Sequence, residues 1–139
     1  MYVAGGPPVI AIIGAGEMGA AVGRRLRETG ARVLVSLAGR RAASAERVRR
    51  AGLEVVHDDH QLANGVDYIL SIVPPAAAIE VAERLQTPLR NAAAAPLFAD
   101  CNAIAPATML RIERLLEPLP VISLSEVDQA TLEKPVKAR

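Results

Sequence analysis

A glycine motif at the end of an apolar run constrains this chain more than any other feature. Residues 14–19 read GAGEMG, which matches the pattern G-x-G-x-x-G, and they directly follow the apolar run VIAII at 9–13. Between a strand and a helix, Gly14 permits the tight turn, Gly16 lets the backbone approach a pyrophosphate, and Gly19 lets the helix pack closely on the strand. The N–H groups at the helix start then form an anion site. The motif predicts a dinucleotide site, and the alternative is a glycine turn without a ligand.

The rest of the chain alternates apolar runs of strand length with segments of helical periodicity. This alternation is typical of βα units that build a parallel sheet with helices on both faces. We expect strands at 9–13, 32–37, 53–56, 66–73 and 97–99, and helices or helical turns at 17–29, 42–51, 58–64, 76–86 and 106–117. The predicted fold is therefore α/β, a Rossmann-type, mostly parallel sheet with the first strand near its centre. We expect this domain to span 1–125 and a polar tail to follow at 126–139.

Composition excludes several classes of protein. The chain has 139 residues, a net charge of +1 and 51% hydrophobic residues, which suits one globular domain and argues against disorder or nucleic-acid binding. Aromatic residues make up 2%, too few for base-stacking platforms. The apolar stretch 68–79 is shorter than the roughly 20 residues that span a bilayer. We therefore expect a cytoplasmic protein with neither a membrane nor a nucleic acid as partner.

Metal and thiol chemistry are not predicted. Cys101 is the single cysteine, which excludes an intramolecular disulfide and any multi-cysteine metal site in this chain, and suits a reducing compartment. A small thiol without an adjacent His or Lys is typical of a core residue rather than a nucleophile. His57 and His60 flank two aspartates, but this spacing in a polar turn favours a surface location. No metal site is expected.

The loop after the second predicted strand indicates which dinucleotide is bound. NAD-binding chains place an acidic residue here, about 20 positions after the glycine motif, to bind the ribose 2′-hydroxyl. This chain offers Ser36, Arg40 and Arg41 instead. A hydroxyl and two guanidinium groups suit a 2′-phosphate through charge-assisted hydrogen bonds. The loop predicts NADP in preference to NAD, and the alternative is that both arginines belong to a solvated basic face.

Three segments give the chain a resemblance to a known superfamily. They are IAIIGAGEMG at 10–19, YILSIVPP at 68–75 and ADCNAIAPATM at 99–109. In this order they resemble the N-terminal domain of the 6-phosphogluconate dehydrogenase and 3-hydroxyisobutyrate dehydrogenase superfamily, the β-hydroxyacid dehydrogenases. The resemblance covers roughly residues 8–117.

The resemblance implies positions for both the cofactor and the substrate. The implied NADP site consists of Gly14, Ala15, Gly16, Glu17, Met18, Gly19, Ser36, Arg40 and Arg41, with Val73, Pro74 and Pro75 near the adenine-ribose or nicotinamide side. The implied substrate is a small hydroxyacid-type molecule, and Asn102, Ala103 and Ile104 would lie at its end of the cleft. The alternative for Asn102 is a turn side chain at a helix entry.

The departure from the superfamily concerns catalysis. Its members continue into a helical domain that supplies a catalytic lysine, a glycine-rich substrate loop and most of the dimer interface. The lysines here are Lys134 and Lys137, in a tail without a glycine-rich segment, so no catalytic residue is assigned. Two functions remain open. One is the NADP(H)-binding part of an oxidoreductase, completed by a partner chain or a missing C-terminal domain; the other is a non-catalytic NADP(H)-binding regulatory or interaction module.

The predicted last helix carries more apolar residues than one sheet contact buries. Within 106–117 these are Met109, Leu110, Ile112, Leu115 and Leu116, and Leu119, Val121, Ile122 and Leu124 follow. An exposed apolar patch of this kind predicts that the chain either self-associates into a homo-oligomer or is only marginally stable. The alternative is a sixth strand at 121–124 that hides these side chains.

Overall fold

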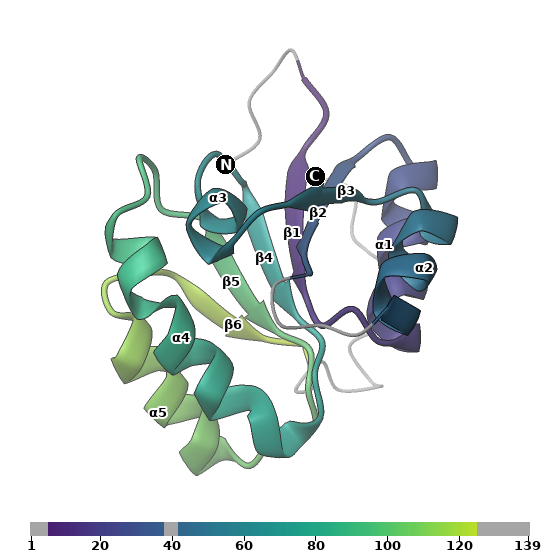
Figure 1. The fold of residues 1–139 in the computed structure, drawn as a ribbon. Coiled ribbons are helices and arrows are strands. Elements are labelled where there is room, and N and C mark those ends of the chain that lie inside the picture. Colours follow the sequence, from purple (N-terminus) through teal and green to yellow (C-terminus); the bar gives the residue numbers. More distant parts are fainter. Residues whose placement is uncertain (1–5, 38–41, 125–139) are drawn as a thin grey trace, which may run out of the picture.

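Short apolar strands alternate with helices in the computed structural model, which describes residues 6–37 and 42–124. The strands in these residues are β1 (Val9–Ile13), β2 (Arg32–Ser36), β3 (Glu54–Val56), β4 (Tyr68–Ser71), β5 (Leu97–Asp100) and β6 (Val121–Ser123). The helices are α1 (Glu17–Glu28), α2 (Ala42–Ala51), α3 (Asp59–Ala63), α4 (Ala78–Arg90) and α5 (Pro106–Leu116), with a 3-10 turn, η1 (Pro75–Ala77), before α4. The predicted order of elements is confirmed (Figure 1).

The strands form one sheet in the order β3-β2-β1-β4-β5-β6, and every pairing between neighbours is parallel. α1 and α2 cover one face of this sheet, and α3, α4 and α5 cover the other (Figure 1). The chain therefore has the Rossmann-type α/β fold that the sequence predicts, with β1 near the centre. β1 and β4 are neighbours whose following helices lie on opposite faces, so their loops diverge at the carboxyl edge of the sheet.

β1 shows why its sequence is a continuous apolar run. Ala11 and Ile13 belong to the core beneath α3, α4 and α5, whereas Ile10 and Ile12 belong to the core beneath α1 and α2. A strand covered on both faces has no solvent-facing position, so it does not alternate apolar with polar residues. The first strand is thus buried against two layers of helices, as expected.

α4 differs from its predicted bounds at both ends. The expected helix covers 76–86, but the chain first makes η1 and then continues as α4 through Pro88 to Arg90. Proline lacks the N–H that would bond the carbonyl four residues earlier, which is why the sequence predicts an earlier end. The helix continues because Leu85, Pro88 and Leu89 are all buried, so tertiary packing outweighs the local cost.

β4 is shorter than its predicted range of 66–73. It pairs from Ile10↔Tyr68 to Ile13↔Ser71 with β1, so the ladder ends where β1 ends. The apolar residues on either side extend the hydrophobic run beyond the paired strand. The length of an apolar run therefore overestimates the length of the strand when the neighbouring strand is shorter than the run.

The sixth strand forms but does not hide all the apolar side chains near it. β6 pairs with β5, and Leu115 packs partly buried against the core. Ile122 and Leu124 remain 40% and 43% exposed. Ile122 pairs with Ala99, whereas Val121 joins the core beneath α4 and α5, so Ile122 lies on the opposite face of the edge strand. Self-association through these side chains stays a prediction.

Two further observations bear on the expected organisation. No helix in residues 6–37 and 42–124 is both long enough and apolar enough to cross a membrane. The predicted polar tail at 126–139 lies outside the described residues.

Candidate functional site

The loops that follow β1, β2 and β4 meet at the carboxyl edge of the sheet around a cavity of about 180 Å³. Its lining residues are Ile12, Ile13, Gly14, Ala15, Ser36, Asp59, Leu62, Val73 and Arg84. Ligands of open α/β folds bind in the crevice where neighbouring connections diverge, and β1 and β4 form that point here. Four of the residues predicted for cofactor binding therefore come together: Gly14, Ala15, Ser36 and Val73.

The glycine loop has the geometry that the motif predicts. Gly14 has φ of +112°, a region that favours glycine, and a Cβ on it would collide with the carbonyl oxygen of Ile72. A Cβ on Gly19 would collide with the carbonyl oxygen of Gly14, so α1 approaches the loop as closely as expected. Gly16 differs, because a Cβ placed on it meets nothing within 4 Å. The space above Gly16 is therefore open.

Gly16 is also the N-cap residue of α1. Its backbone is extended and no side chain caps the helix. The first N–H groups of a helix have no partner within it, and the helix dipole places partial positive charge there. Glu17 and Met18 in the first turn are exposed. The start of α1 thus presents uncapped N–H donors next to open space, which is the local arrangement that suits a phosphate.

An arginine of α2 that is not among the predicted site residues contacts this loop. Arg47 Nη1, from α2, donates a hydrogen bond to the carbonyl oxygen of Ala15 at 2.9 Å. Neither residue spacing nor composition marks Arg47, because it stands among several arginines of α2. Its contact depends on how α2 lies beside α1 in the fold.

Asp59 and Arg84 also line the cavity, and neither is among the predicted site residues. Arg84 Nε lies 2.8 Å from Asp59 Oδ2, which joins α4 to α3. The neighbouring Asp58 instead caps α3, because its Oδ1 accepts from the Gln61 N–H at 3.0 Å. This hydrogen bond lowers the pKa of the Asp58 carboxyl. His57 and His60 are exposed, as expected, and no group of possible metal ligands occurs among the residues that the structure describes.

Asn102 joins the ends of β4 and β5 through its side-chain amide. Its Oδ1 accepts a hydrogen bond from the Val73 N–H at 2.8 Å, and its Nδ2 donates to Ser71 Oγ at 3.3 Å and to Asp100 Oδ2 at 3.2 Å. Asn102 is 5% exposed. Both atoms of its amide group are thus engaged within the protein, in the manner of a turn side chain. Contact between Asn102 and a substrate stays a prediction.

Asp100 and Cys101 stand beside this network. Burial raises the pKa of the Asp100 carboxyl, and the hydrogen bonds from Asn102 oppose this shift. Burial, together with the charge of Asp100, raises the pKa of the Cys101 thiol to about 11. A thiol with so high a pKa is protonated at neutral pH, so it is a poor nucleophile. The raised pKa agrees with the expectation that Cys101 is not a nucleophile, but Cys101 is half-buried and belongs to neither core cluster, so it is not the core residue that the sequence predicts.

The remaining predicted residues are not among those that line the cavity, and two of them lie outside the described residues. Pro74 and Pro75 are exposed at the start of η1, after the loop that Asn102 holds. Ala103 is exposed and Ile104 is half-buried, one step beyond Asn102. Arg40 and Arg41 lie outside the described residues, so their contact with a 2′-phosphate stays a prediction.

The family model described as NADP oxidoreductase, coenzyme F420-dependent, matches residues 9–102 of this chain. The match begins with β1 and ends at Asn102, so it includes the glycine loop and the network between β4 and β5. No curated protein is detectably similar to the chain in sequence.

Solved structures share the fold of this chain. A conserved protein of unknown function, described as similar to 3-hydroxyacid dehydrogenases, has a TM-score of 0.71 at 26% identity, over 81% of this chain and 41% of that chain. The 3-hydroxyisobutyrate dehydrogenase of Mycobacterium tuberculosis has a TM-score of 0.69 at 21% identity, over 84% and 39%. A protein from an Arthrobacter species, described as an F420-dependent NADP-reductase, has a TM-score of 0.64 at 15% identity, over 82% and 60%. This chain spans about two fifths of the length of the first two.

Proposed function

Because the chain belongs to the family described as NADP oxidoreductase, coenzyme F420-dependent, we propose that residues 1–125 form the NADP(H)-binding domain of an oxidoreductase similar to 6-phosphogluconate and 3-hydroxyisobutyrate dehydrogenases. The observation that carries the proposal is the glycine loop at the divergence of β1 and β4. Gly14 makes the turn that glycine alone makes without strain, and Gly16 leaves open space beside the uncapped start of α1. These residues fit a pyrophosphate.

The division of the crevice follows from the strand order. The end of β2 is where dinucleotide-binding folds hold the adenosine ribose, so Ser36 and Ala15 belong to the adenosine side. Val73 follows β4 and Asn102 follows β5, and both strands lie on the other side of β1 from β2. The nicotinamide would lie on that side. A bound nicotinamide supplies hydride transfer. The chain's own residues bind and orient the dinucleotide.

Substrate handling is proposed to come from outside this domain. Residues 6–37 and 42–124 contain no lysine, so the general acid/base of the similar dehydrogenases has no counterpart there. We assign the small hydroxyacid-type substrate to a helical domain on a partner chain or a C-terminal segment, with Asn102, Ala103 and Ile104 facing it. A preference for NADP over NAD is assigned to Ser36, Arg40 and Arg41.

The experiment is calorimetric titration of the pure chain with NADPH and NADH. Gly16→Val should weaken binding of both by more than about tenfold, because its side chain fills the open space above the loop. Gly6→Val is the matched control, since a Cβ on Gly6 also meets nothing within 4 Å. Loss of binding in both variants, or in neither, contradicts the assignment of the loop.

A second candidate function is a non-catalytic NADP(H)-binding regulatory or interaction module. It is favoured by the engagement of both amide atoms of Asn102 within the protein, which leaves that group committed to the fold. The two functions predict different results when the chain is mixed with a partner that carries the helical domain. Turnover of NADPH in the mixture supports the enzyme, whereas binding without turnover with every such partner supports the module.

A further inference from the structure

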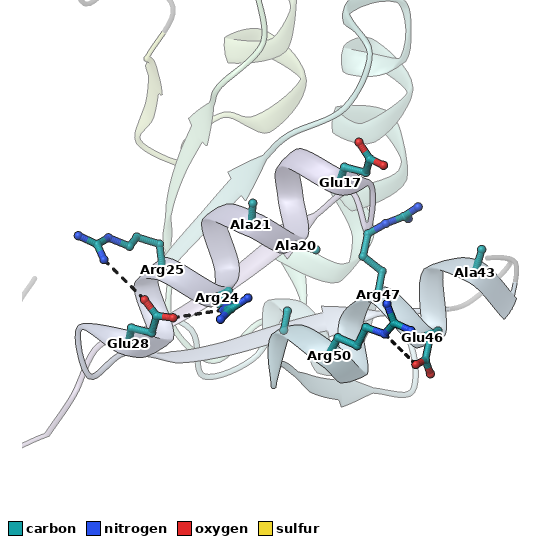
Figure 2. Close-up of a pocket in the computed structure, with 11 residues that line it drawn as sticks. Glu17, Ala20, Ala21, Arg24, Arg25, Glu28, Ala43, Glu46, Arg47 and Arg50 are labelled. Carbon is teal, nitrogen blue, oxygen red and sulfur yellow. Dashed lines mark hydrogen bonds and ion pairs between the residues drawn. The ribbon is translucent and has the colours of Figure 1, made fainter.

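Four arginines line a groove between α1 and α2. The groove has a volume of about 760 Å³, and four alanines also line it. Its charged residues are Glu17, Arg24, Arg25, Glu28, Glu46, Arg47 and Arg50 (Figure 2). Three of these arginines are neutralised within their own helix. Arg24 and Arg25 lie 3.2 and 3.6 Å from the Glu28 carboxylate, and Arg50 lies 3.0 Å from that of Glu46.

Arg47 differs from the other arginines of the groove. It makes no ion pair within the part of the chain that the structure describes, and it is half-buried rather than exposed. Figure 2 shows it extending from α2 toward the start of α1, where Glu17 lies. Its one hydrogen bond within the described residues goes from Nη1 to the neutral carbonyl oxygen of Ala15. No carboxylate of residues 6–37 and 42–124 therefore pairs with Arg47, and its charge stands at the glycine loop.

The charge of Arg47 lies on the side of the crevice where the adenosine half of a dinucleotide binds in this architecture. Ala15 lines the cavity with Ser36, the last residue of β2, and α2 is the next element along the chain. The ribose of the adenosine half lies between the glycine loop and the end of β2 in this architecture. A guanidinium has five N–H donors, so Arg47 keeps donors for an anion while Nη1 bonds Ala15. A phosphate ester on that ribose would place its charge next to an arginine that lacks a carboxylate partner.

We propose that Arg47 is a specificity-determining residue that binds the phosphate on the adenosine 2′-oxygen while it holds the Ala15 carbonyl. The inference rests on the proposed dinucleotide site. It adds a residue of α2 that binds the phosphate, separate from the predicted Arg40 and Arg41. Arg47 is placed so that one side chain both orients the glycine loop and discriminates the phosphorylated from the unphosphorylated dinucleotide.

The test compares two pairs of ligands on three variants. NADPH with NADH, and adenosine 2′,5′-bisphosphate with adenosine 5′-phosphate, differ in each pair by the 2′-phosphate. Arg47→Ala should weaken the phosphorylated member of each pair by about 10- to 100-fold and the other member by less than about threefold. Arg47→Lys keeps the charge and should recover part of the loss. Arg50→Ala is the matched control, because Arg50 lies one turn further along α2 and pairs with Glu46. This substitution should leave the affinity for both members of each pair unchanged.

Each other outcome overturns the inference. Equal weakening of both members by Arg47→Ala means that Arg47 only orients the loop, and no change means that it does not contact the ligand. Thermal unfolding of each variant, with and without ligand, shows whether the fold is retained; if Arg47→Ala does not fold, Arg47→Lys must still lose selectivity. If the unchanged chain binds neither NADPH nor NADH, the proposed function fails and this inference fails with it. If the unchanged chain binds NADPH and NADH, and Arg47→Ala does not weaken the phosphorylated ligands more than the others, this inference alone fails.

Discussion

Asn102 Oδ1 accepts a hydrogen bond from the backbone N–H of Val73 at 2.8 Å, so one buried side chain joins the loops after β4 and β5. The same amide also donates to Ser71 and Asp100. Backbone groups at the end of a strand lose their ladder partners, and an unpaired buried N–H is costly. Asn102 therefore stabilises the edge of the crevice at the point where the nicotinamide half of a dinucleotide is proposed to lie.

Replacing Asn102 should destabilise the fold. Asn102→Ala leaves the Val73 N–H and the Ser71–Asp100 pair without their partner, and we expect a loss of about 1–3 kcal/mol in the free energy of unfolding. Asn64→Ala is the control, because Asn64 is exposed and its Oδ1 accepts from the Ala93 N–H at 3.2 Å. Urea denaturation measures both. Equal, small losses in the two variants would show that burial of the Asn102 network adds nothing.

Asp100 should make stability depend on pH in the direction opposite to most carboxylates. Burial raises its native pKa, so the native state binds this proton more tightly than the unfolded state does. The stabilising contribution is present below the unfolded pKa of about 4 and is lost as pH rises through the raised native pKa. The free energy of unfolding of the unchanged chain minus that of Asp100→Asn should therefore decrease from about pH 3 to about pH 7.

Asp58 provides the internal comparison for this pH dependence. The hydrogen bond from the Gln61 N–H lowers its native pKa, so its contribution is present above the unfolded pKa and is lost as pH falls. The corresponding difference for Asp58→Asn should increase with pH over the same range. Two differences with the same slope would contradict the opposite environments of these carboxyls.

The two glycines of the turn should respond differently to a methyl group. Gly14→Ala places a Cβ against the Ile72 carbonyl at a positive φ, and we expect a loss of more than about 2 kcal/mol in the free energy of unfolding. Gly16→Ala meets open space and should cost less than about 1 kcal/mol. Chemical denaturation monitored by circular dichroism measures both. Similar losses would mean that Gly14 is not required for the turn.

The half-exposed side chains of β6 and the residue after it predict self-association. Ile122→Ser with Leu124→Ser should reduce any concentration-dependent increase in sedimentation coefficient, because both side chains are about two-fifths exposed at the sheet edge. Val55→Ser is the control, since Val55 is 55% exposed on β3, at the opposite edge of the sheet. A monomer at every concentration would show that β6 marks no association surface.

The local pattern of the sequence was sufficient for the order of elements and for the glycine turn. A few consecutive residues are enough to identify an apolar strand, a glycine motif or an amphipathic helix, because the period of a strand or helix repeats over that length. The glycines at 14 and 19 followed in the same way, since a Cβ on either would collide with a backbone carbonyl oxygen. The bounds of α4 did not follow, because burial of Pro88 depends on a neighbouring helix.

The contacts between loops were decided by the tertiary structure. Arg47 meets Ala15 across 32 positions, and Asn102 meets Val73 across 29. In the sequence Arg47 is indistinguishable from Arg49 and Arg50, which pair with Glu46 instead. The difference arises because parallel crossovers bring the carboxyl ends of separate strands, and the helix beside them, to one edge of the sheet. The sequence alone thus determined that a tight glycine loop joins β1 to α1, and the packing of α2 on α1 decided which charged side chain reaches it.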